Sequence, residues 1–166
     1  ALGLARIGAR VVLIDTNLRN PHIHKIFGVA NRTGLSTILY TDKISDMTGE
    51  TVDSLSDVLQ PTPEPNLTIL PSGPVVDAAP VLLSSARMGN IIDRLSRDAF
   101  VIIDSPAVLT TSEAMILASK SGSILMVVNA QHTTAAKLNQ SLGMLSHLRV
   151  DVRGVVLNQV RKSSRV

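Results

Sequence analysis

Five short apolar runs dominate this sequence, and each is bounded by polar or turn-forming residues. They are rich in Val, Ile and Leu and occupy Val11–Ile14, Leu67–Leu70, Val101–Ile103, Ile124–Val128 and Gly154–Leu157. Their apolar character is continuous rather than alternating, which is typical of strands buried on both faces in a parallel sheet. The runs therefore predict a sheet that helices cover on both sides.

Amphipathic helical patterns lie between the later runs, at Ala79–Leu95, Ser112–Ser119 and Thr134–Leu148. The interval from Gly28 to Pro80 is looser, and we interpret it as loops with a short helix at Gly34–Tyr40. Alternating strands and helices predict an α/β, doubly wound, mostly parallel sheet flanked by helices. At 166 residues the chain is about one domain long. We expect a single domain over residues 1–160 and a basic tail at 161–166.

The composition excludes several classes of protein. The chain has no cysteine, which rules out disulfides, zinc–thiolate sites, iron–sulfur clusters and a thiol nucleophile. Three aromatic residues are too few for the stacking platforms that bind single-stranded nucleic acid. The net charge of +3 is small for a dedicated DNA-binding protein. No apolar run approaches the roughly 20 residues of a membrane helix. We expect no nucleic-acid partner and no membrane-spanning segment in this chain.

Two of the apolar runs end in an aspartate, "VVLID" at Asp15 and "FVIID" at Asp104. Ligands of doubly wound sheets bind at the carboxyl ends of the strands, and neighbouring strands lie about 4.8 Å apart. If the two strands are neighbours, both carboxylates can share one Mg²⁺, which takes one or two carboxylates with waters and phosphate oxygens. Alternatively, each aspartate caps the loop after its strand. Arg19 follows in the same loop, where a guanidinium meets phosphate or remains solvated.

The sequence has no glycine-rich phosphate loop followed by Lys-Ser/Thr. The nearest match, Gly3 to Gly8, lacks the lysine and the hydroxyl and precedes a strand where a phosphate loop follows one. We interpret it as a helix with Gly8 as its C-cap. His22 and His24 form a His-x-His pair. Without a third ligand, this pair indicates a turn or helix start after Pro21 rather than a metal site.

The segment "GARVVLIDTNLRNPHIHKIFGVANRTGLSTIL" resembles the bacterial tyrosine kinases (BY-kinases) of exopolysaccharide and capsule synthesis, which belong to the ParA/MinD-like deviant-Walker ATPases. The similarity continues through "NLTILPSGP", "FVIIDSPAVLTTSEAMILASKSGSILMVVNAQHTTAAKL" and "GVVLNQV", and so covers nearly the whole chain. It implies a P-loop NTPase-like kinase domain without its first strand and Walker A loop. We therefore expect further sequence upstream of Ala1.

The resemblance also implies roles for individual residues, with ATP and Mg²⁺ as cofactors. Residues 12–19 match the family's second Walker element, Asp-x-Asp-x-Arg, in which Asp15 would serve Mg²⁺ and the attacking hydroxyl. Asn17 replaces the second aspartate, and an amide brings no negative charge and cannot act as a base. Arg19 matches the arginine. Asp104 matches the Walker B aspartate, which holds a water of the Mg²⁺ shell. Asn158 falls where relatives read adenine, or else is a polar residue that ends a strand.

These matches predict an ATP-dependent protein-tyrosine autokinase or ATPase domain that regulates exopolysaccharide or capsule polymerisation and export. Three departures oppose activity of the 166 residues alone: the missing Walker A loop, Asn17, and Tyr40 as the only tyrosine. We therefore expect this chain by itself to be inactive. One alternative is a degenerate, non-catalytic regulatory module of the same system. Another is a partitioning ATPase of the ParA or MinD kind.

The resemblance further implies partners and a place in the cell. Family members act beside a membrane-spanning polysaccharide co-polymerase that activates them, and they cycle between ring oligomers and monomers. We therefore expect a homo-oligomer of the intact protein. We also expect a cytoplasmic location at the inner face of the cell membrane, reached through a partner or a fused membrane segment.

Overall fold

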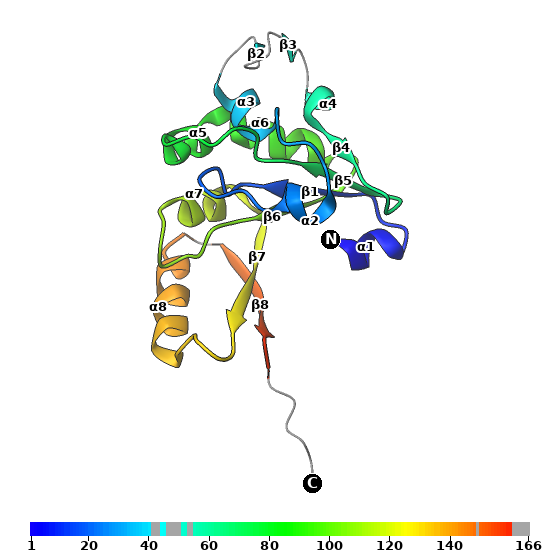
Figure 1. Cartoon of the computed structure of the whole chain (residues 1–166). Coiled ribbons are helices and arrows are strands. Elements are labelled where there is room, and N and C mark those ends of the chain that lie inside the picture. Colours follow the sequence, from blue (N-terminus) through cyan, green and yellow to red (C-terminus); the bar gives the residue numbers. More distant parts are fainter. Residues whose placement is uncertain (41–43, 46–50, 53–54, 149, 161–166) are drawn as a thin grey trace. The chain divides into compact units, whose positions relative to one another are not determined.

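The computed structural model describes residues 1–40, 44–45, 51–52, 55–148 and 150–160 (Figure 1). The chain folds as two compact units, one from Ala1 to Pro106 and one from Ala107 onward. The single domain expected over residues 1–160 stays a prediction. The expected basic tail at 161–166 lies outside the described residues. Within the described part of the chain, no helix has both the length and the hydropathy needed to cross a membrane.

The first unit is built on a four-stranded sheet. Its strands are β1 (Val11–Asp15), β4 (Gln60–Pro61), β5 (Leu67–Leu70) and β6 (Phe100–Asp104), in the order β4-β5-β1-β6. Strand β1 pairs in parallel with β5 and β6, while β4 runs antiparallel at the edge. The three parallel strands confirm the prediction from the apolar runs. The sequence analysis missed β4, a two-residue strand containing a proline, which sheets tolerate at an edge.

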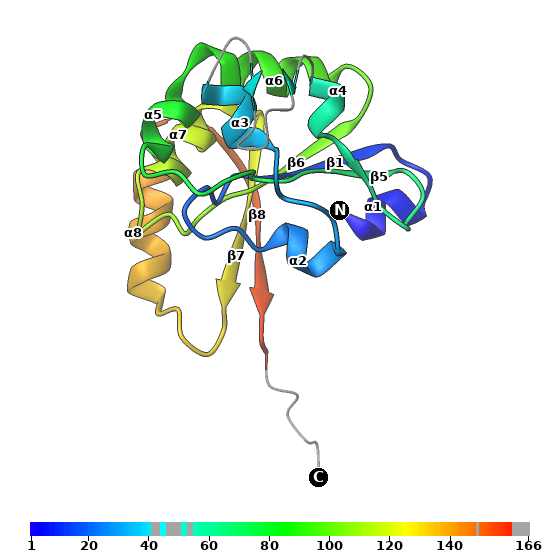
Figure 2. The same cartoon turned by 45° about the horizontal axis from the view of Figure 1, so that its top comes forward.

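Helices cover both faces of this sheet, as predicted. They are α1 (Leu2–Arg6), α2 (Ile23–Phe27), α3 (Leu35–Tyr40), α4 (Leu55–Val58), α5 (Ala79–Ser84) and α6 (Ala86–Ser96). Figures 1 and 2 show α1 and α2 on one side of the strands and α5 and α6 on the other. On the α1 and α2 side, Ala5 and Ile23 pack with Val11, Leu13 and Leu67. A further antiparallel pair joins β2 (Ile44–Ser45) to β3 (Thr51–Val52).

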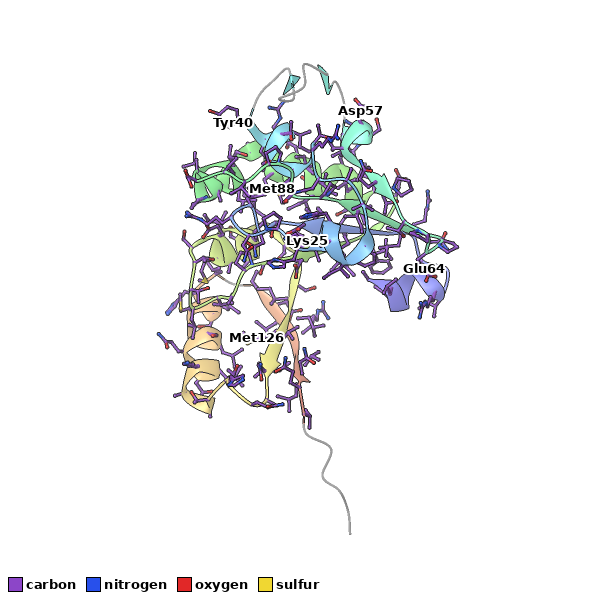
Figure 3. The ribbon with its side chains drawn as sticks, in the orientation of Figure 1. Lys25, Tyr40, Asp57, Glu64, Met88 and Met126 are labelled. Atoms are coloured by element: carbon purple, nitrogen blue, oxygen red, sulfur yellow. The ribbon has the colours of Figure 1, made fainter. Side chains whose placement is uncertain are left out.

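The strand β1 forms the centre of the core. All five of its residues are buried, which agrees with its continuous apolar sequence. Met88 of α6 is completely buried and is labelled in Figure 3 between this helix and the strands. Burying a side chain of this size contributes about 2 kcal/mol relative to exposure. The core thus fixes the position at which β1 ends.

The helix expected over Ala79–Leu95 is interrupted. Ser85 has an extended backbone (φ −58°, ψ 153°) and separates α5 from α6. Its hydroxyl donates to the carbonyl of Leu82 at 2.7 Å and accepts the N–H of Met88 at 3.4 Å. Serine side chains often compete in this way with the helical backbone and cap a new helix. The apolar spacing alone did not indicate the break.

The segment Gly3 to Gly8 forms an ordinary short helix and turn, as expected, but the C-cap lies one residue before the predicted Gly8. Ile7 is the C-cap of α1, and Gly8 follows it with a φ of 91°, a conformation that favours glycine. Arg6 forms an ion pair with Glu64, the residue labelled in Figure 3, at 3.0 Å. This pair is largely exposed and contributes little to stability.

The described residues of the second unit form a parallel pair of strands and two helices. Its elements are α7 (Glu113–Lys120), β7 (Ser123–Asn129), α8 (Ala135–Ser146) and β8 (Asp151–Asn158). Met126 and Val128 pack with Ala118 and Leu145 of the helices. Leu125 is 61% exposed, although the continuous apolar run predicts burial on both faces. The reason is that, within this unit, α7 and α8 contribute to the cluster on one face of β7.

A close backbone junction joins the start of α3 to the loop after β5. The N–H of Leu35 donates to the carbonyl of Pro71 at 2.8 Å. The side chain of Asn31 both donates to the carbonyl of Gly73 (2.9 Å) and accepts its N–H (2.8 Å). A Cβ at Gly34 would collide with the backbone of Pro71 and Gly73. Because backbone atoms cannot rotate away as a side chain can, the junction requires glycine at position 34.

We expect Gly34→Ala to lower the free energy of unfolding by about 2 kcal/mol or more, since the collision forces the junction apart. Gly89→Ala is the matched control, because a Cβ at this position in α6 meets nothing within 4 Å. There the helix propensity of alanine should raise stability by up to about 1 kcal/mol. Urea unfolding measures the free energy of unfolding of both variants. Equal stabilities would show that the junction does not require glycine at position 34.

Candidate functional site

The two aspartates that end apolar strands lie side by side at one edge of the sheet. Asp15 is the last residue of β1, Asp104 is the last residue of β6, and the two are paired in the parallel register. This adjacency confirms the placement expected from the strand ends. It puts two carboxylates on neighbouring strands at the edge where ligands of such sheets bind.

The carboxylate of Asp15 is fully buried and organises the loop that follows β1. Its Oδ1 accepts the N–H of Asn17 at 3.1 Å. Its Oδ2 accepts the N–H groups of His22 at 3.2 Å and Ile23 at 3.1 Å. A carboxylate has about four acceptor positions, so these three bonds leave one. Asp15 therefore caps its loop, as one of the two interpretations had it, and these bonds leave one acceptor position of its carboxylate unused.

Thr16 is a residue of the site that the sequence analysis missed. It is 1% exposed, and its N–H and its hydroxyl both donate to the carbonyl of Asp104. These bonds extend the pairing of β1 with β6 by one residue and hold the two aspartates in register. The only signal in the sequence was a hydroxyl residue directly after a strand, which is too common to single out.

Asp104 differs from Asp15 in its surroundings, because its side chain lies at the surface. Partial removal from water raises the pKa of the Asp104 carboxyl above its ordinary value of 3.8, and the negative charge of Asp15 raises it further. His22 acts in the opposite direction and lowers it. The two carboxylates thus repel each other, and a cation between them would remove that repulsion.

Asn17 and Arg19 lie on the loop that Asp15 holds. The side-chain Oδ1 of Asn17 accepts the N–H of Asn20 at 3.1 Å, so this amide stabilises the turn. Arg19 is exposed on the same loop. The roles expected for Asn17 and Arg19 in catalysis stay predictions.

The His-x-His pair marks a helix start, as the sequence indicated. His22 is the N-cap residue of α2, and its Nδ1 lies 2.7 Å from the carbonyl oxygen of Asn20. Among the described residues, no three His, Cys, Asp or Glu side chains gather in a way that could hold a metal ion. Any ion between Asp15 and Asp104 would therefore need waters or ligand oxygens to complete its shell.

Asn158, the residue expected to meet adenine, ends β8 in the second unit. Its Oδ1 accepts the N–H of Gln159 at 2.9 Å. The neighbouring strand β7 ends at Asn129, its partner in the register. Two amide side chains therefore stand at adjacent strand ends here, where the first unit has two carboxylates.

Comparison with known proteins places this geometry in context. No protein-family model matches the chain. It is 32% identical over 152 residues to the tyrosine-protein kinase Wzc of Salmonella typhimurium, covering 91% of this chain and 20% of that protein. It is 29% identical over 162 residues to the tyrosine-protein kinase Ptk of Acinetobacter johnsonii, covering 97% and 21%. The chain is a homologue of the bacterial tyrosine kinases. It spans about a fifth of the length of these curated relatives.

Solved structures of this kinase family share the fold. The kinase domain of the Escherichia coli tyrosine kinase ETK matches with a TM-score of 0.88 and 26% identity, covering 99% of this chain and 61% of that one. The septum site-determining protein MinD of Pyrococcus horikoshii, complexed with Mg-ADP, matches with a TM-score of 0.73 at 24% identity and covers 99% and 63%. The fold is therefore that of the BY-kinases and MinD-like P-loop NTPases, as the resemblance implied.

The donors at the strand ends fit the Mg²⁺ that the family's nucleotide chemistry implies. Two carboxylates together with waters and phosphate oxygens are a set that Mg²⁺ accepts. Burial raises the pKa of the Asp104 carboxyl, and the negative charge of Asp15 raises it further; a cation between the two carboxylates would oppose this second effect. The bonds already made by Asp15 limit it to one further contact, so Asp104 is the better placed ligand.

We expect Asp104→Asn to stabilise the protein at pH 7 and to lose that effect at pH 3. The folded state holds the Asp104 proton more tightly than the unfolded chain does, so stability falls as pH rises from 3.8 through the raised pKa. The gain should stay below about 1 kcal/mol because solvent screens an exposed group. Urea unfolding at both pH values tests this, with Asp93→Asn of α6 as the control for lost charge. The prediction would be contradicted if the wild type were more stable than Asp104→Asn at pH 7.

We expect Asp15→Ala to cost about 3 kcal/mol of unfolding free energy, because it leaves buried N–H donors without an acceptor. Asn17→Ala is the matched control on the same loop. It removes one side-chain hydrogen bond to Asn20, at a cost of about 1 kcal/mol. Thermal and urea unfolding measure both variants. Equal losses would show that Asp15 does not hold the loop.

Proposed function

We propose that this chain is part of an ATP-dependent protein-tyrosine autokinase that regulates exopolysaccharide or capsule polymerisation and export. The observation that carries the proposal is the paired Asp15 and Asp104 at adjacent parallel strand ends, in a chain whose homologues are tyrosine kinases. Phosphoryl transfer depends mainly on positioning and charge neutralisation. Two carboxylates on neighbouring strand ends suit both tasks.

The residues divide the work according to their surroundings. Asp104, with its exposed carboxylate, would hold the Mg²⁺ shell. Asp15 has one acceptor position left, with which it would contact the ion or orient the attacking tyrosine hydroxyl. Arg19 would meet phosphate oxygens from the loop that Asp15 holds. Bound Mg²⁺·ATP supplies the phosphoryl group and the charge that neutralises the carboxylates. Asn158 would contact the adenine.

The remaining roles follow from the family and belong to the same proposal. The intact protein would act as a homo-oligomer beside a membrane-spanning polysaccharide co-polymerase. It would therefore work at the inner face of the cell membrane. The phosphate-binding loop that holds the nucleotide in such proteins does not occur among these 166 residues.

A second candidate function is a non-catalytic regulatory module of the same system. Asn17 favours it, because the residue stands where kinase relatives have a second aspartate and its side chain is bonded to Asn20. An amide in this position cannot accept the proton of an attacking hydroxyl. The two candidates differ in whether Asp15 alone suffices for that step.

Autophosphorylation of the full-length protein with Mg²⁺·ATP separates the candidates. We expect phosphotyrosine in the wild type, a loss of about 100-fold or more in the initial rate for Asp104→Asn, and a similar loss for Asp15→Asn. Asn17→Ala should stay within about threefold of the wild type if Asp15 suffices. Phosphotyrosine is measured by radiolabel transfer and by mass spectrometry.

Two other results would overturn the kinase proposal. ATP binding without phosphotyrosine in the wild type would favour the regulatory module. ATP hydrolysis without phosphotyrosine, stimulated by DNA or by a protein partner, would indicate a partitioning ATPase. Tyr40, which is labelled in Figure 3 and 71% exposed, provides an internal check. Tyr40→Phe removes the only tyrosine of these 166 residues. Any phosphotyrosine that persists in this variant therefore lies elsewhere in the full-length protein.

A further inference from the structure

Tyr40 is the last residue of α3, and its side chain is 71% exposed. Figure 3 shows this side chain projecting outward from the end of the helix. Most of the other residues of α3 face inward, since Leu35, Ser36, Ile38 and Leu39 are buried. The helix therefore packs by one face and presents a phenolic hydroxyl to the surroundings. No other tyrosine occurs among the 166 residues.

The start of α3 is anchored, which fixes the place of this hydroxyl. The N–H of Leu35 donates to the carbonyl of Pro71 at 2.8 Å, and the N–H of Ser36 donates to the carbonyl of Ser72 at 2.7 Å. The hydroxyl of Ser36 donates to the carbonyl of Pro74 at 2.8 Å. These three bonds join the helix to the loop that follows β5, so α3 cannot turn about its own axis without breaking them.

The anchored helix keeps Tyr40 apart from the carboxylates of its own chain. Asp15 and Asp104 end β1 and β6, whereas α3 is attached at the end of β5 and packs beside α5 (Figures 1 and 2). To bring its outward side chain to those strand ends, α3 would have to break the bonds to the loop after β5 and expose Ile38 and Leu39. The burial of such apolar side chains opposes this movement. The hydroxyl is therefore available to another molecule rather than to the site of its own chain.

We propose that Tyr40 is a phosphorylation site, whose hydroxyl accepts the γ-phosphoryl group of ATP bound to a second copy of the same protein. The inference rests on the proposed function, because it assumes that the site of Asp15 and Asp104 transfers phosphate to tyrosine. It adds an acceptor residue within the first unit, which the proposed function leaves open.

The transfer to Tyr40 needs only the hydroxyl and the bound nucleotide. The phenolic oxygen forms a bond to the γ-phosphorus, while the bond from that phosphorus to the oxygen of the β-phosphate breaks and ADP leaves. The phenolic proton passes to solvent by way of the unused acceptor position of Asp15 in the second copy. The products are phosphotyrosine and ADP, and the step consumes no other reactant.

Incubation of two full-length proteins with Mg²⁺·ATP tests the proposal. The enzyme is the unlabelled wild type, and the acceptor is Asp104→Asn, expected to be inactive by itself and labelled with heavy nitrogen so that mass spectrometry separates its peptides. Trypsin cleaves after Arg32 and Lys43 and releases residues 33–43, in which Tyr40 is the only tyrosine. We expect phosphate on Tyr40 of the heavy peptide in the mixture and none when the heavy protein is incubated alone.

The matched control is a heavy acceptor that carries Tyr40→Phe together with Asp104→Asn. Phenylalanine keeps the ring but lacks the hydroxyl, so this protein should lose the phosphate on the peptide of residues 33–43. Fragment-ion spectra distinguish Tyr40 from the serine and threonine residues of the same peptide. Thermal unfolding reports whether both acceptors are folded.

The outcomes distinguish the acceptor role of Tyr40 from the proposed function. Phosphotyrosine elsewhere in the wild type, with Tyr40 unmodified in both copies, would overturn the acceptor role and leave the kinase proposal in place. Phosphate on Tyr40 of the unlabelled chain alone would overturn transfer between copies. A folded wild type that forms no phosphotyrosine at any position would overturn the proposed function and the acceptor role with it.

Discussion

The hydrogen bonds from three backbone N–H groups to the buried carboxylate of Asp15 are the interaction on which the first unit's candidate site depends. They draw residues 17–23 back over the end of β1 and start α2 at a defined position. A buried carboxylate is costly unless its hydrogen bonds are made. Here the cost is offset by donors that the loop would otherwise leave unpaired, because a helix start and a turn both expose N–H groups. The loop and the carboxylate therefore stabilise each other.

This arrangement gives the two aspartates different properties although they end adjacent strands. Asp15 is immobilised, and its remaining capacity for a partner is small. The backbone carbonyl of Asp104 accepts the two donors of Thr16, while its carboxylate lies at the surface with a pKa raised by burial and by Asp15. Burial and the charge of Asp15 both disfavour the ionised form of Asp104, so its ionisation at neutral pH costs stability. Such costs are common where a structure prepares a site for a charged ligand.

Sequence patterns predicted the sheet well because burial on two faces leaves a strong and local trace. The continuous apolar runs gave the strands, and the parallel register then brought Asp15 next to Asp104 without further information. The break at Ser85 was not predictable in this way, since the apolar spacing continues across it and only the hydroxyl's bonds reveal it. Thr16 was missed for a similar reason. Its importance comes from a carbonyl 88 positions later in the chain, which no local pattern records.

The ends of β7 and β8 also hold contacts that sequence patterns do not record. Asn158 could be singled out as the last residue of a strand, but the sequence does not show that its Oδ1 accepts the N–H of Gln159. Nor does it show that Asn129, at the end of β7, donates to the side chain of Gln159. The same principle operates at Asp15, where a polar group at a strand end receives its orientation from the segment that follows. In the carboxylate both oxygens can only accept, so the constraint fixes the position of the group but not the kind of bond that each oxygen forms. In the amide, the bond from one backbone N–H opposes the exchange of oxygen and nitrogen and so decides which end of the side chain donates.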